Sequence, residues 1–290
     1  MDRAAVDWTT DAVVAALARD ETIDPLALTF LLRRYAATDS DELRDELQGV
    51  LEPALARGLE RGACADAPGE RARWLMLFAE AVDFSEDGRL PGAASGLIAA
   101  LRSDWGRSAD VGHAAASVEG CLAAAHLVDP QSIVPAAIDE LERVIGSAYR
   151  VGEGLSGRRI ADHIRLASAL LTAYGMTARL PYPMLAEELL QFVRRTKWNG
   201  ELGRFVEPGH DDLSSFVVNC DAARVFVRLA ALHRIDDYRA SAVIAAGAAY
   251  DDDAARILNA LNGCYRDFGI ASAAYGLALM EWEALREIAD

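Results

Sequence analysis

The most constraining feature of this sequence is the near-regular return of an apolar helical stripe. Six such stripes end near Tyr35, Ala81, His126, Tyr174, Leu232 and Trp282, so their ends are 46, 45, 48, 58 and 50 residues apart. Most of them run into a short polar turn and a second amphipathic helix, as in LLRRYAATDSDELRDELQGVLEPAL. A repeat of this size is one helix pair, and pairs that contact only their neighbours stack into an array. The sequence therefore predicts an all-α fold.

Apolar periodicity, caps and breakers predict two series of helices. The first series covers residues 25–37, 70–82, 111–128, 159–176, 213–234 and 270–288. The second series covers residues 41–60, 89–104, 131–149, 182–196 and 236–262, with a break in the last around Tyr250 to Asp252. Local signals agree with these bounds, since Asp39 or Ser40 can cap a helix and Pro91 suits a first turn.

The two series leave one helix of the first type without a partner. An amphipathic segment from Trp8 to Ala18 can supply it by pairing with the C-terminal helix. Six hairpins would then close into an (α/α)6 toroid, which we expect to be a single domain over residues 1–290. The alternative is an open solenoid of the HEAT or armadillo type. Closure is favoured because the last helix, ASAAYGLALMEWEAL, is strongly apolar on one face and needs a partner.

Composition excludes several classes of function. A formal net charge of −16 argues against nucleic-acid partners, which need clustered Lys and Arg. No apolar run reaches the roughly 18 residues of a membrane span, and no basic segment precedes an apolar run at the start. We therefore expect a soluble, cytoplasmic protein with no membrane partner.

Cysteine usage gives no sign of redox or metal chemistry. Cys64, Cys121, Cys220 and Cys264 are scattered and form no C-x-x-C pair. Three of them sit among apolar neighbours, where a thiol packs as a small hydrophobe. We expect neither a metal nor a cofactor.

The longer connections all precede helices of the first series. They cover residues 61–69, 105–112, 150–158, 197–212 and 263–269. In a toroid these loops would form one rim around the mouth of the central cavity, and loops on a rigid scaffold often carry function. Helices of the first series also begin there, so their free N–H groups would favour an anionic or hydroxyl-rich ligand.

Aromatic residues and carboxylates gather in these loops, as is typical of a sugar site. We take as candidate catalytic residues Glu207, His210, Asp211, His163 and Glu201. We take as candidate substrate-binding residues Trp198, Phe205, Arg204, Trp105 and Asn219. The same residues could instead plug the ends of the hairpins and cap helices. His113, His163 and His210 lie on this rim, and any of them could exchange a proton near neutral pH.

A run from residue 163 to 277 resembles the helical toroids of six-hairpin glycosidases. The run contains HIRLASALLTAYGMT, MLAEELLQFVRRTKWNGELGRFVEPGHDD and NCDAARVFVRLAALHRIDDYRASA. It is most similar to the C-terminal toroid of bacterial thioredoxin-domain proteins related to spermatogenesis-associated protein 20, and next to N-acylglucosamine and cellobiose epimerases. The matching elements are Gly203 to Glu207, the small residues that follow Asn219, and Tyr238 with Arg239. The resemblance implies a toroid, and the epimerases imply a pair of histidines on the rim.

Two hypotheses for function follow. The first is a carbohydrate-active toroid, a hydrolase or an epimerase, that binds a saccharide at the long-loop rim. Two carboxylates about 5 to 5.5 Å apart would indicate retaining hydrolysis, and about 6.5 to 9.5 Å inverting hydrolysis. The second is a non-catalytic helical-repeat protein that binds a peptide or a partner protein.

Overall fold

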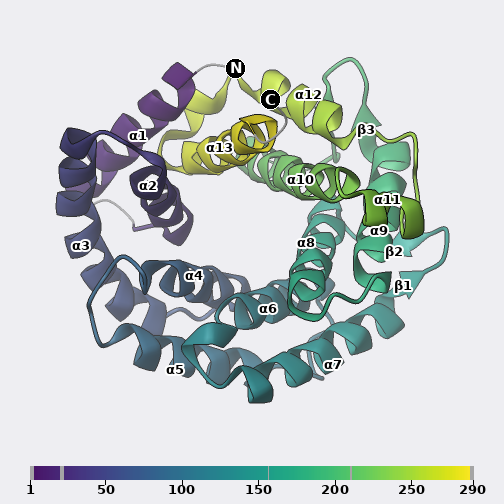
Figure 1. The fold of residues 1–290 in the computed structure, drawn as a ribbon, viewed down its shortest axis with the longest axis horizontal. Coiled ribbons are helices and arrows are strands. Elements are labelled where there is room, and N and C mark those ends of the chain that lie inside the picture. The colour runs from purple at the N-terminus through teal and green to yellow at the C-terminus, as the bar shows by residue number, and fades with distance from the viewer. Residues whose placement is uncertain (1–2, 20–22, 156, 210, 288–290) are drawn as a thin grey trace.

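The helices of this protein form a closed ring of two layers (Figure 1). The computed structural model describes residues 3–19, 23–155, 157–209 and 211–287. The inner layer consists of α2 (Pro25–Ala37), α4 (Pro68–Ala81), α6 (Val111–Ala123), α8 (Ile160–Thr177), α10 (Asp212–His233) and α13 (Ala273–Glu287). The outer layer consists of α1 (Arg3–Ala18), α3 (Asp41–Ala63), α5 (Leu90–Ser103), α7 (Pro130–Ala148), α9 (Pro181–Lys197), the short α11 (Asp236–Ser241) and α12 (Tyr250–Leu261).

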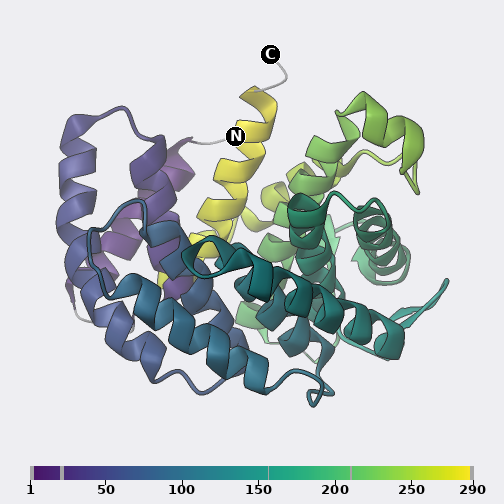
Figure 2. The ribbon, with the colours of Figure 1, turned by 60° about the horizontal axis from the view of Figure 1, so that its bottom comes forward.

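The ring closes where the ends of the chain meet. Helix α13 packs against both α2 and α1, and each inner helix contacts the next around the ring. The prediction of a closed (α/α)6 toroid is thereby confirmed. Figure 2 shows the outer helices wrapping the inner ones, with both ends of the chain on the same side.

Several helix boundaries differ from the predicted ones for local reasons. The stripe predicted over 111–128 is broken, because α6 gives way to a 3₁₀ turn, η1, at Ala125–Leu127. The last helix starts later than predicted, after a 3₁₀ segment, η2 (Tyr265–Ser272), in which Gly269 takes a φ of 52°. The break between α11 and α12 spans residues 242–249, just before the predicted position at Tyr250.

Caps begin many of the helices. The carboxylate of Asp24 accepts hydrogen bonds from the N–H groups of Leu26 (2.7 Å) and Ala27 (3.2 Å) at the start of α2. Ser40, one of the two predicted caps, accepts from the N–H of Leu43 at the start of α3. Such caps satisfy N–H groups that the helix itself leaves free.

The core lies between the two layers. Trp74 and Phe78 of α4 are fully buried against α3. A Cβ atom on Gly58 of α3 would lie 2.8 Å from the Trp74 ring, and one on Gly62 would lie 2.9 Å from the Phe78 ring. The two glycines therefore allow the outer helix to approach the inner one closely.

Two β-hairpins interrupt the long-loop rim. Strand β1 (Tyr149–Arg150) pairs with β2 (Gly154–Leu155), and β3 (Trp198–Asn199) pairs with β4 (Arg204–Phe205). The sequence predicts loops over these residues, because strands of two residues are too short to show an alternating pattern. No α-helix in the described ranges is both long and apolar enough to cross a membrane.

Candidate functional site

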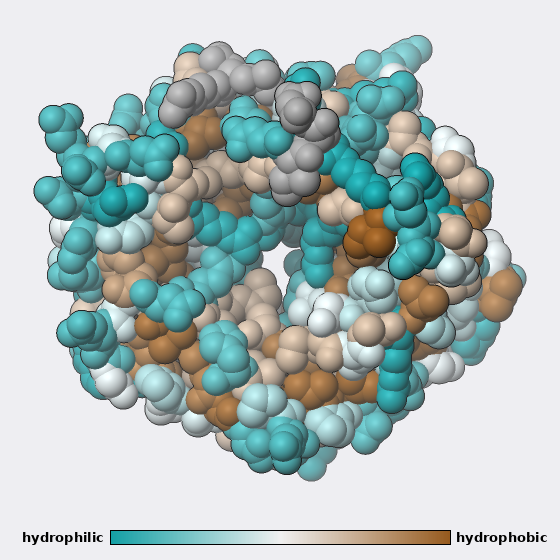
Figure 3. Space-filling model, in the orientation of Figure 1, coloured by the Kyte–Doolittle hydropathy of each residue, from teal (hydrophilic) through white to brown (hydrophobic). Residues whose placement is uncertain are grey.

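The centre of the ring is hollow, and hydrophilic residues cover much of its wall (Figure 3). Along each inner helix, partly exposed residues recur at helical spacing, and the residues between them are mostly buried. On α10 the exposed positions include Asp221, Arg224 and Arg228, and on α8 they include Arg165 and Ser168. We call the space that these side chains border the central channel.

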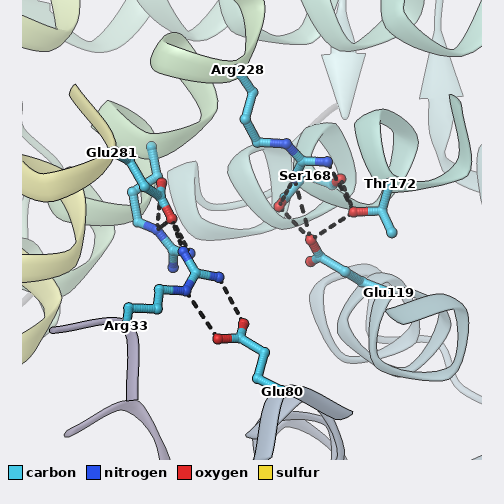
Figure 4. Close-up of polar contacts among 8 residues, drawn as sticks. Arg33, Glu80, Glu119, Ser168, Thr172, Arg228 and Glu281 are labelled. Carbon is cyan, nitrogen blue, oxygen red and sulfur yellow. Dashed lines mark hydrogen bonds and ion pairs between the residues drawn. The ribbon is translucent and has the colours of Figure 1, made fainter. Parts of the chain in front are cut away.

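An ion-pair cluster lines the channel where the ring closes (Figure 4). Arg33 of α2 donates to Glu80 of α4 over 2.7 and 3.0 Å and is also paired with Glu281 of α13. Arg224 of α10 donates to the same Glu281 over 2.8 to 3.1 Å. Burial alone would raise the pKa of Glu281, but the guanidinium groups of Arg224 and Arg33 bring this pKa below its usual range.

A second cluster links α10 to α8 and α6 (Figure 4). Arg228 donates to the hydroxyls of Ser168 and Thr172, each over 3.0 Å, and lies 3.5 Å from a carboxylate oxygen of Glu119. Ser168 in turn donates to Glu119 over 2.6 Å. The two clusters together involve every inner helix. Their residues lie at or beyond the middle of each helix, so the two clusters lie deeper in the channel than the long-loop rim.

On α10, Asp221 lies about one helical turn nearer the long-loop rim than Arg224 of these clusters, and Arg228 lies deeper still. Its carboxyl is reached by the electric fields of Arg224, Arg165, Arg73 and Glu119, which come from four inner helices. Within the described part of the chain, the Asp221 carboxyl forms no hydrogen bond or ion pair, and the same holds for Arg165 and Arg73. Three charged groups thus share the upper channel without partners of their own.

The environment of Asp221 favours its protonated form. The carboxyl is partly exposed, yet only toward the channel, and it lies deep among the inner helices. This burial raises the pKa of Asp221, although the nearby guanidinium groups of Arg224, Arg165 and Arg73 oppose the shift. A carboxylic acid with a raised pKa in a cavity is a candidate proton donor.

Sequence reasoning missed these channel residues. The available signal was the spacing of Asp221, Arg224 and Arg228, which places three charges on one face of a helix that is otherwise rich in Ala, Val and Leu. Charged residues in the middle of an apolar helix must face either a partner or a cavity.

The predicted catalytic residues are dispersed along the long-loop rim. Glu207 accepts from the N–H of Ile160 over 3.3 and 3.4 Å and so caps α8. Asp211 caps α10, accepting from the N–H and the hydroxyl of Ser214, each over 2.8 Å. Glu201 is exposed in the turn between β3 and β4, and His210 lies outside the described residues.

His163 is buried at the start of α8, and both of its ring nitrogens have backbone partners. Nε2 accepts from the N–H of Leu155 over 3.0 Å, and Nδ1 donates to the carbonyl of Arg159 over 2.9 Å. The ring also stacks on Phe192. Burial lowers the pKa of His163 and keeps the ring neutral. A role for His163 in proton transfer stays a prediction, and it would require the loss of one of these bonds.

Four of the predicted binding residues meet at the second hairpin. Phe205 is buried and lies edge to face with Trp198, 5.2 Å between ring centres. The side chain of Asn219 accepts from the N–H of Phe205 over 2.8 Å and donates to its carbonyl over 3.1 Å. Arg204, the neighbour of Phe205 in β4, is partly exposed. These contacts attach the hairpin to α10.

Trp105 lies apart from that group, in a separate pocket of about 410 Å³. The pocket opens where α4 and α6 begin, beneath the loop that joins α5 to α6. Its lining includes Asp66, Arg71, Asp104, Trp105, Arg107 and His113. In the ranges that the structure covers, no three His, Cys, Asp or Glu side chains lie together in a way that could bind a metal ion.

Comparisons with known proteins identify the fold. No protein-family model matches this sequence, and no curated protein matches it either. Among solved structures, an unsaturated glucuronyl hydrolase specific for heparin is similar with a TM-score of 0.68 and 12% identity, over 99% of each chain. The alpha-1,6-mannanase from Salegentibacter sp. HEL1_6 is similar with a TM-score of 0.64 and 11% identity, over 97% of this chain and 99% of that one. An inactive variant of that mannanase, with two consecutive aspartates replaced by asparagine, is also similar; its structure holds alpha-1,6-mannotriose. At this level of identity the likeness shows the fold alone, and that fold is the six-hairpin (α/α)6 toroid of carbohydrate hydrolases.

Proposed function

We propose that this chain is a carbohydrate-active enzyme that admits a saccharide to the upper central channel, where Asp221 gives a proton to the departing glycosidic oxygen and water attacks the anomeric carbon. The observation that carries the proposal is the Asp221 carboxyl, which forms no hydrogen bond or ion pair in the described part of the chain and lies nearer the rim than the paired charges of the channel. Cleavage of a glycosidic bond needs an acid that protonates the leaving oxygen, and a carboxyl whose pKa is raised by its surroundings suits that role.

The charge around Asp221 favours an acidic saccharide. Arg165 and Arg73 face the same carboxyl, and neither has a hydrogen-bonded partner in the described chain. Guanidinium groups bind carboxylates and sulfates through paired N–H groups. We therefore propose a sugar unit with a carboxylate or sulfate as the one nearest Asp221. Support comes from a similar structure, whose name describes an unsaturated glucuronyl hydrolase specific for heparin.

A second set of carboxylates competes for the catalytic role. The similar mannanase is inactive when two consecutive aspartates are replaced, and this chain has consecutive aspartates at Asp211 and Asp212, where α10 begins on the rim. Glu207 lies on the same rim. These residues, with Glu201, stay candidates for an acid or a nucleophile that acts at the mouth of the channel.

Hydrolysis is preferred here to the epimerisation suggested by the resemblance to N-acylglucosamine epimerases. Epimerisation would require two histidines that face the ligand, and His163 already uses both ring nitrogens on backbone groups. Epimerisation is therefore the second candidate for the activity of this chain.

The test compares four proteins on two panels of oligosaccharides. The panels are uronate-bearing oligosaccharides and neutral alpha-mannooligosaccharides, with reducing ends or unsaturated ends as the readout. Wild type should cleave an acidic member, and Asp221→Asn should lose at least about 100-fold of that activity. Asp252→Asn, an exposed carboxylate of outer helix α12, is the matched control and should keep full activity.

Asp211→Asn separates the two candidate sites. Asparagine is as good a helix cap as aspartate, so this variant should fold normally and lose activity only if Asp211 takes part in the chemistry. If Asp221→Asn is as active as wild type while Asp211→Asn is inactive, the reaction takes place at the rim and the assignment of Asp221 is wrong. If wild type cleaves no member of either panel, the proposed function itself fails.

A further inference from the structure

We propose that the pocket beside Trp105 is a second binding site, which takes a single neutral sugar unit. The inference rests on the proposed function for its ligand class, because saccharides are the ligands proposed for this ring. The pocket is separate from the upper channel, since none of Asp221, Arg165 and Arg73 belongs to its lining.

The walls of the pocket are held in place without any ligand. The indole N–H of Trp105 donates to the Ser117 hydroxyl of α6 over 2.8 Å. The next residue, Gly106, has a φ of 75° and donates its N–H to the buried carboxylate of Glu140 over 3.1 and 3.2 Å. Glu140 also accepts from Arg143 over 2.6 and 2.7 Å. A preformed pocket binds at lower entropic cost than one that must be assembled.

The size of the pocket matches a small ligand. A volume of about 410 Å³ lies in the lower part of the range found for ligand pockets in proteins. This space accommodates one sugar ring with its substituents and excludes a folded peptide segment. Trp105 lines the cavity, and the guanidinium of Arg102 lies over its ring, 5.8 Å from the ring centre, so the part of the ring that Arg102 does not cover is what the apolar C–H face of a sugar can pack against.

The charges of the Asp, Glu and Arg side chains around the pocket balance when Arg143, which lies outside the lining, is counted with them. The carboxylate of Glu140 is neutralised by Arg143, and Arg71 lies 3.7 Å from the carboxylate of Asp104. Two exposed lining residues of opposite charge remain, Asp66 and Arg107. A pocket without excess charge gives no advantage to an ionic ligand, while carboxylate acceptors and guanidinium donors suit hydroxyl groups.

The pocket and the channel are therefore suited to different sugar units. Arg71 borders the pocket, and Arg73, two residues later on α4, contributes its field to the channel at Asp221.

Indole NMR tests this inference without any need for turnover. The chain has five tryptophans, so the ¹⁵N-labelled protein gives few indole signals, and Trp105→Phe identifies the one from Trp105. Methyl glucoside, methyl mannoside and N-acetylglucosamine are titrated to about 100 mM, well above a millimolar dissociation constant. Glucuronate and glucose 6-phosphate serve as the charged comparisons.

We expect a saturable shift of the Trp105 signal with at least one neutral sugar. Asp66→Asn and Arg107→Gln, both exposed, should weaken that binding about 5-fold to 10-fold, since each replaces a charged hydrogen-bonding group with a neutral amide that bonds hydroxyl groups less strongly. Arg195→Gln on outer helix α9 is the matched control and should bind as wild type does. A Trp105 signal that responds to none of the neutral sugars, or only to the charged ones, would overturn the proposal.

The channel variant separates this inference from the proposed function. Asp221→Asn should abolish cleavage and leave the shift of Trp105 unchanged. A protein that shows the shift but cleaves no saccharide would refute the enzymatic proposal alone. A protein that cleaves a saccharide without the shift would refute the pocket alone.

Discussion

Arg33 and Glu281 form an ion pair although 248 residues separate them in the chain. Arg33 lies on the first inner helix and Glu281 on the last, so their contact fastens the two ends of the ring together. Glu281 is held from the other side by Arg224, and Arg33 by Glu80. This set of charges lines the channel and closes the toroid at the same place.

Loss of the Glu281 charge should destabilise the ring. Glu281→Gln leaves Arg33 and Arg224 without their shared carboxylate, and we expect a loss of about 2 to 3 kcal/mol in the free energy of unfolding. This is below the full cost of breaking a buried pair because both arginines are partly exposed. Urea denaturation measures it, with the exposed Glu287→Gln as control. Equal midpoints for the two variants would contradict the role given to Glu281.

The Glu281 carboxylate should also make the free energy of unfolding depend on pH in the acid range. The pKa of Glu281 is lower in the folded protein than its ordinary value of 4.5, so its contribution is present above about pH 4.5 and is lost as the pH falls through the folded value. Wild type should therefore lose more stability than Glu281→Gln between pH 6 and the acid range. Thermal unfolding at a series of pH values gives the two slopes, and parallel curves would argue against this linkage.

Packing at the closure should tolerate no added methyl group. A Cβ atom on Gly276 of α13 would lie 2.5 Å from the ring of Phe30 on α2. Gly276→Ala should therefore cost about 1 to 3 kcal/mol. Gly175→Ala on α8 is the matched control, since nothing lies within 4 Å of its Cβ position. The control should be neutral or stabilising by about 0.5 to 1 kcal/mol, because alanine favours a helix over glycine.

Asn219 should matter more for stability than an exposed asparagine of the same hairpin. Asn219→Ala leaves both backbone polar groups of the buried Phe205 without their partner, at a cost of about 2 to 3 kcal/mol. Asn199→Ala removes only exposed bonds to the N–H groups of Glu201 and Leu202, at about 1 kcal/mol or less. Hydrogen exchange of the β4 amides should increase in the first variant and remain unchanged in the second.

The pH dependence of activity should report on Asp221. Burial raises the pKa of this carboxyl, so it stays protonated to a higher pH than an exposed aspartate and loses its proton as the pH rises through that value. If Asp221 is the acid, kcat/KM should fall on the alkaline side of its optimum. Any residual activity of Asp221→Asn should lack that fall. An alkaline limb that persists in the variant would assign it to another group.

The repeat alone was enough to determine the architecture. Apolar stripes at a helical period mark which face of each helix is buried, and this information lies within some 15 residues of chain. Proline and short polar residues add the boundaries, as Pro25, Asp24 and Ser40 show. The closure also followed from sequence, because an apolar terminal helix needs a partner and the segment at Trp8 to Ala18 was the one remaining.

The candidate site could be predicted only in part. The sequence pointed to the long-loop rim, and Trp105 does line a pocket there. Asn219 and His163 were selected as residues that could meet a ligand, and the structure shows their polar atoms bonded to backbone groups of the hairpins. The sequence alone does not distinguish a side chain that bonds a buried backbone group from one that is available to bind a ligand.

Only the tertiary structure decided which charges are paired and which are free. Arg33, Glu281 and Arg224 come from three helices far apart in the chain and meet because the ring closes. The two arginines that follow Asp221 on α10 are bonded to other carboxylates, Arg224 to Glu281 and Arg228 to Glu119, and Asp221 forms no ion pair in the described part of the chain. Local periodicity fixes the direction in which a side chain points, whereas its partners depend on the distances between helices, which only the closed ring sets.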